Sequence, residues 1–169
     1  MKRIICVLFL LSCTVHAVAR RPKIKLAEVL SVELNRVLAA TDELHTACVE
    51  KDENKIVVKT KGLLQAIDKA QAKINLAKQQ KPHLERILNA AEAHLELTQL
   101  SEGDQRRQNL KDAFAQLVQV AQVFSLDKYL IYFCPKDRAV WLQKNSRSKG
   151  KASNPVSPTK HPSCGRLVR

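Results

Sequence analysis

The chain has few of the residue patterns on which common catalytic and cofactor sites depend. Its four glycines, at positions 62, 103, 150 and 165, are too scattered to form a phosphate-binding loop. It contains no Cys-x-x-Cys-His motif for covalent haem, and no Glu-x-x-His pair that could hold a di-iron centre on one helix face. No pattern pairs a cysteine nucleophile with a histidine base. We therefore expect a protein that is not an enzyme.

Long apolar runs are also missing. The apolar run IICVLFLL, residues 4–11, has eight residues, whereas a membrane-spanning helix needs about 20. This run follows the cationic MKR and precedes Ala17-Val18-Ala19, which has small residues at the two positions that a signal peptidase recognises. The pattern predicts a signal peptide over residues 1–19 and export to the periplasm or beyond. The alternative is a lipoprotein anchored through Cys13, because the preceding LLS loosely resembles a lipoprotein box.

Cysteine is scarce in the exported part of the chain. Cys48, Cys134 and Cys164 remain after cleavage. In an oxidising compartment, three thiols suggest one disulfide and one leftover thiol, which is usually buried.

Acidic residues are nearly absent from the C-terminal part. From Cys134 to Arg169 there are nine Lys and Arg but one acid, Asp137, whereas residues 20–133 hold eighteen basic and fifteen acidic residues. Outside the cytoplasm, the partners of such a tail would be an envelope protein or an anionic membrane or lipopolysaccharide surface, and not nucleic acid. In the alternative interpretation, the charge only keeps the tail soluble.

Four segments place apolar residues at alternating steps of three and four, which keeps them on one face of a helix. These four seams are Leu30, Leu34, Val37, Thr41, Leu44 and Cys48; Ile56, Thr60, Leu63, Ile67, Ala70, Ile74 and Ala77; Leu84, Leu88, Ala91, Leu95 and Thr98; and Leu110, Ala113, Leu117, Val120 and Phe124. They predict an all-α fold, with an antiparallel up-down-up-down four-helix bundle over residues 20–126. Short connections are expected near 50–53, 79–82 and 100–104.

Residues at the helix ends agree with this division. Asp52 can cap the second helix, Pro82 suits the first turn of the third, and Ser101 with Asp104 resembles a capping box for the fourth. His45 and Cys48 are three residues apart and could both touch one metal ion. Because Cys48 lies on the hydrophobic seam, we favour its role as a small hydrophobic residue.

The tail, residues 127–169, is expected to pack on one end of the bundle. The stretch YLIYFC, residues 129–134, is rich in β-branched and aromatic residues and predicts an extended segment. Residues 138–143 could form a short helix whose Trp141 and Leu142 cover the end of the bundle. Residues 144–163 are mostly polar and predict a loop.

The order of residues in the tail resembles that of an uncharacterised bacterial envelope domain, which occurs alone and at the ends of some copper/silver efflux membrane-fusion proteins. The residues that carry the resemblance are Tyr132, Cys134, Pro135, Trp141, Leu142, Asn154, Pro155, Cys164 and Gly165. The resemblance implies a helical periplasmic module associated with copper handling. Two methionines of the family pattern are replaced here by Lys136 and His161. This replacement removes thioether ligands that Cu(I) favours.

Two interpretations of Cys134 and Cys164 follow. A disulfide would close a thirty-residue loop and stabilise the polar tail by about 3–4 kcal/mol in the chain-entropy model. Alternatively, the two thiolates with His161 would form a copper site. Because the methionines are absent, we favour the disulfide, with Tyr132 packing the tail beside Trp141 and Leu142. The expected function is that of an exported, non-catalytic envelope module with a disulfide-anchored basic tail, and a copper-binding accessory protein is the alternative.

Overall fold

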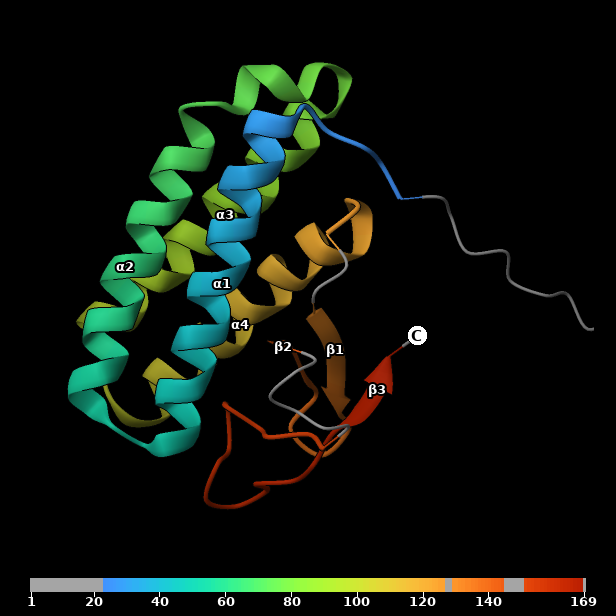
Figure 1. Cartoon of the computed structure of the whole chain (residues 1–169). Coiled ribbons are helices and arrows are strands. Elements are labelled where there is room, and N and C mark those ends of the chain that lie inside the picture. Colours follow the sequence, from blue (N-terminus) through green and yellow to red (C-terminus); the bar gives the residue numbers. More distant parts are fainter. Residues whose placement is uncertain (1–22, 127–128, 145–150, 169) are drawn as a thin grey trace, which may run out of the picture.

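A computed structural model describes residues 23–126, 129–144 and 151–168 (Figure 1). Its helices are α1 (Glu28–Glu50), α2 (Glu53–Gln71), the 3-10 helix η1 (Ile74–Gln80), α3 (Lys81–Leu100) and α4 (Gly103–Val123). Its strands are β1 (Tyr129–Cys134), β2 (Ala139–Lys144) and β3 (Arg166–Val168). Within these described ranges, no helix is both long and apolar enough to cross a bilayer. The predicted signal peptide, 1–19, and the alternative anchor, Cys13, lie outside the described residues.

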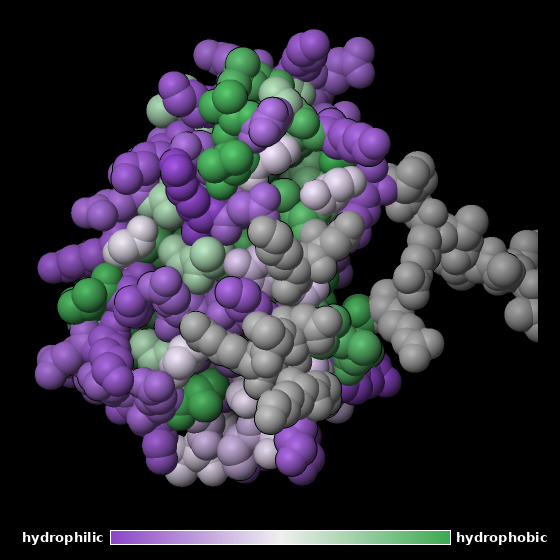
Figure 2. Space-filling model, in the orientation of Figure 1, coloured by the Kyte–Doolittle hydropathy of each residue, from purple (hydrophilic) through white to green (hydrophobic). Residues whose placement is uncertain are grey.

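The four long helices run alternately up and down, as the seams predict (Figure 1). Every predicted seam residue is buried, and Leu34, Leu63, Leu88 and Leu117 are each 0% exposed. On the face seen in Figure 2, hydrophilic side chains cover most of the helices and hydrophobic ones are confined to patches. The periodicity of three and four residues therefore places the core correctly.

Two of the three predicted helix starts are confirmed. The Asp52 carboxylate accepts a hydrogen bond from the Lys55 backbone N–H at 3.0 Å, and Pro82 lies in the first turn of α3. The capping box at Ser101 is wrong, because α4 starts after Glu102 and no side chain caps it. Ser101 Oγ instead donates to the Leu97 carbonyl oxygen at 2.7 Å, so its hydroxyl closes the preceding helix.

The connection between α2 and α3 is longer than the sequence suggests. The α-helix ends at Gln71, and the last part of the second seam, Ile74 and Ala77, lies in η1. Both residues are still buried, because positions three apart share a face of a 3-10 helix. Within η1, Lys78 takes a positive φ of 51°, which kinks this segment before α3 begins at Lys81.

The prediction of an all-α fold is wrong in the tail, where three antiparallel strands form a sheet in the order β2-β1-β3. Residues 139–144 form β2 and not a short helix. The turn between the strands ends at Arg138, whose φ is 50°, and pairs Tyr132 with Trp141, whose stacked rings lie 6.1 Å apart. Because β2 packs against α4 and α1, the tail and the helices share one hydrophobic core. The fold is therefore a four-helix body with a small sheet on its side.

Candidate functional site

Cys134 and Cys164 are joined in a disulfide, the pairing favoured from the sequence. Cys134 ends β1 and is 0% exposed, and Cys164 lies two residues before β3. Because the two sulfur atoms are bonded to each other, the oxidised chain offers no thiolate here. The alternative copper site also needs His161, whose Nδ1 instead donates to Asp137 Oδ1 at 2.9 Å. Over residues 23–126, 129–144 and 151–168, no three His, Cys, Asp or Glu side chains are grouped to hold a metal ion.

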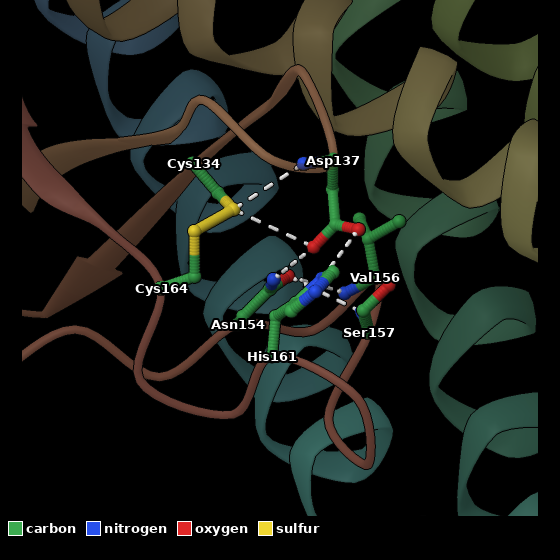
Figure 3. The surroundings of a disulfide bond; sticks show 7 residues. All are labelled: Cys134, Asp137, Asn154, Val156, Ser157, His161 and Cys164. Carbon is green, nitrogen blue, oxygen red and sulfur yellow. Dashed lines mark hydrogen bonds and ion pairs between the residues drawn. A yellow bond between two sulfur atoms is a disulfide. The ribbon is translucent and has the colours of Figure 1, made fainter.

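Asp137 links the β1–β2 turn to the rest of the tail (Figure 3). Its backbone N–H points to Cys134 Sγ at 3.4 Å, and its second carboxylate oxygen accepts from Asn154 Nδ2 at 2.7 Å. The Asn154 Oδ1 atom in turn accepts from the Val156 backbone N–H at 3.0 Å. With the His161 bond, these contacts fix residues 154–161 against the hairpin.

These contacts also set the charge of Asp137. Burial alone would raise the pKa of this carboxyl group. Hydrogen bonds from His161, Asn154 and Ser157, with the positive charge of His161, outweigh burial and lower the pKa below 3.8. The single acid of the tail is therefore ionised and already has partners.

Four further residues of the sequence pattern pack the tail. Trp141 is 0% exposed, and its indole N–H donates to Gln143 Oε1 at 3.0 Å. Gly165 packs closely against the indole and leaves no room for a side chain. A Cβ there would lie 2.9 Å from two ring carbons and 2.6 Å from the Ala152 Cβ. Tyr132 is 2% exposed, and Leu142 is 0% exposed. The pattern in the tail therefore reflects packing and hydrogen bonding.

Two hydrogen bonds attach this packed tail to α1. The Lys144 backbone N–H donates to Asp42 Oδ1 at 2.9 Å, and His45 Nε2 donates to the Ser153 carbonyl oxygen at 2.8 Å. His45 thus serves tail docking, which does not favour the His45/Cys48 metal pair. Burial, with a smaller effect from the charge of Glu53, raises the pKa of the Cys48 thiol to about 12.

A cleft of about 350 Å³ opens between α4 and the tail, on the side of Asp137 and His161. Four cationic side chains line it: Arg107 and Lys111 from α4, and Lys136 and Lys160 from the tail. Asp137 is the one acidic residue of the lining. Since its carboxylate is engaged by tail residues, the cleft has an excess of positive charge.

The lysines of this cleft are available for a ligand. Arg107 pairs with Asp104 at 2.9 Å, an exposed contact of the kind that contributes little. In the described part of the chain, Lys111, Lys136 and Lys160 form no ion pair. Comparisons with protein-family models, with curated proteins and with solved structures gave no match to this chain. The cleft itself is therefore the feature from which we infer a function.

The sequence indicated a basic tail but missed the half of the site that lies on α4. Arg107 and Lys111 are four residues apart, so they share a helix face, and this spacing was the available signal. Nothing local showed that this face lies against the tail, because the fold brings together residues more than twenty positions apart.

Proposed function

We propose that the protein is an exported, non-catalytic module of the bacterial envelope that binds an anionic partner in the cleft between α4 and the tail. The partner is an anionic membrane or lipopolysaccharide surface or an acidic envelope protein. The observation that carries this proposal is the convergence of four cations, two from α4 and two from the tail, around one partnered carboxylate. Cationic side chains that served only to keep the chain soluble would not need to lie together in a concave site.

The disulfide supports the same proposal in two ways. Disulfides persist in oxidising compartments outside the cytoplasm. The bond also ties the segment that carries Lys136 to the segment that carries Lys160, since it joins residues 134 and 164. A fixed arrangement of cations loses less conformational entropy on binding than a flexible tail would.

The experiment measures binding of the oxidised chain from Arg20 to phosphatidylcholine vesicles with and without anionic phosphatidylglycerol. We expect binding that needs the anionic lipid and is lost at about 1 M salt, where charges are screened beyond about 3 Å. Vesicle binding that does not weaken as the salt concentration rises would contradict a basic interface.

A matched pair of variants tests whether the cleft is responsible. The cleft variant, Lys111→Gln with Lys160→Gln, removes one charge from each wall. The control variant, Lys69→Gln with Lys73→Gln, removes two charges near the end of α2, at the opposite end of the bundle (Figure 1). We expect the cleft variant to bind vesicles several-fold more weakly than the control variant. Equal losses would show that net charge, and not the cleft, governs binding.

A further inference from the structure

The chemistry of the cleft indicates which kind of anion fits it. We infer that the cleft binds one phosphate monoester group, an inference that rests on the proposed function and specifies its ligand. Four cations and His161 line a volume of about 350 Å³. This is at the lower end of the range for small-ligand pockets, about 300–1,000 Å³, so the cleft suits a head group and not a long polymer.

The charge of the lining favours a multiply charged ligand. A carboxylate carries one negative charge, which one of the lysines could balance. A phosphate monoester carries about −1.5 to −2 at pH 7 and has three strong acceptor oxygens. Lysines act as point charges that bind phosphate from several directions. Lys111, Lys136 and Lys160 approach the cleft from three different segments of the chain, as such binding requires.

His161 provides a directed contact beside these charges. Its Nδ1 is held by Asp137 at 2.9 Å, and its side chain is 31% exposed. The bond to Asp137 fixes the ring, and no residue in the described ranges forms a hydrogen bond with Nε2. In the protonated ring, Nε2–H is a donor for a phosphate oxygen, and the ordered ring aims that donor.

The phosphate group could belong to a lipid head group or to a soluble phosphate ester, which share this chemistry. The first arm of the experiment titrates the oxidised chain from Arg20 with inorganic phosphate. Amide chemical shifts at residues 136, 157 and 161 are followed by NMR, and acetate at equal ionic strength is the comparison anion. We expect saturable shifts with phosphate and not with acetate. The cleft variant should bind phosphate about tenfold more weakly, while the control variant should change by less than about twofold.

The second arm identifies the source of the phosphate. Vesicles that contain phosphatidic acid, a monoester, are compared with vesicles of equal surface charge that contain phosphatidylglycerol, a diester. Saturable phosphate binding with a preference for phosphatidic acid supports the site and a lipid ligand. Saturable phosphate binding without that preference supports the site and a soluble ester.

Three results would overturn the inference, and the first two separate it from the proposed function. Salt-sensitive vesicle binding without saturable phosphate binding would remove the monoester site and leave the anionic-surface function. The absence of both kinds of binding would remove both proposals. Equal phosphate affinity in the cleft and control variants would also refute the site, and circular dichroism of each variant checks that it is folded.

Discussion

Breaking the bond between Cys134 and Cys164 should destabilise the tail strongly, and the molecule contains a probe that reports on the tail alone. The bond closes a loop of 30 residues. In the chain-entropy model, such a loop contributes about 3.6 kcal/mol at 25 °C. A double variant, Cys134→Ala with Cys164→Ala, removes this contribution without burying a hydroxyl. With a urea dependence of about 1–3 kcal/mol per molar, the unfolding midpoint of the tail should fall by about 1–4 M.

The assay compares two signals during urea unfolding. Trp141 is the only tryptophan and is buried in β2, so its fluorescence follows the sheet. Circular dichroism at 222 nm follows the helices. In the oxidised protein the two transitions should coincide, because β2 shares a core with α1 and α4. In the double variant, the Trp141 transition should move to lower urea and precede the helical one.

The control is Cys48→Ala, which removes the free thiol and keeps the disulfide. It should lower both transitions together and by a smaller amount, since it removes one small buried group from the helical core. A Trp141 transition that stays within about 0.3 M of wild type in the double variant would refute the idea that the disulfide stabilises the tail.

Three further predictions concern single positions. Gly165→Ala should lower the free energy of unfolding by about 1–3 kcal/mol, since the new methyl group would overlap Trp141 and Ala152, and urea unfolding measures the loss. Asp137 has a pKa that is lower in the folded state, so its contribution to stability is complete above pH 3.8 and is lost as the pH falls through the folded pKa. Asp137→Asn should therefore show less loss of stability between about pH 5 and pH 2 than wild type, and an equal loss would contradict this linkage. Cys48, with a pKa of about 12, should resist iodoacetamide in the folded protein and react on unfolding, so rapid labelling under native conditions would show that the thiol is accessible.

The helical part was predictable because its signal is local. Residues such as Leu84 and Leu88 meet their own neighbours one turn away, so the stripe that they form appears within a single segment. The errors occur where two local signals compete. Ser101 could cap the next helix or close the previous one, and the hydroxyl bonds to Leu97. The seam through Ile74 continues in a 3-10 helix, which the spacing of apolar residues does not distinguish from an α-helix.

The sheet was missed because strand pairing is not local. The segment AVWLQK, residues 139–144, contains good helix formers and no alternation, and its turn lacks the Asn-Gly or Asp-Gly pair typical of hairpins. Its conformation depends on Tyr132, which stacks on Trp141 across the strand pair, and on α4 beneath the sheet. Pairing of this kind can be read only after the fold has placed the partners.

The candidate site, like the sheet, is formed by residues that are distant from one another in the sequence. The residues that form the recognisable tail pattern, such as Trp141 and Gly165, are occupied with packing, whereas the cations that make the cleft lie outside that pattern. A binding surface can therefore change its lysines without disturbing the scaffold that the pattern encodes. The connection between the two is Asp137, which binds His161 and Asn154 and lies within the loop that the disulfide closes. Because this carboxylate forms no ion pair with the described residues of α4, the helix side of the cleft stays cationic, and an outside anion is the partner that we propose for it.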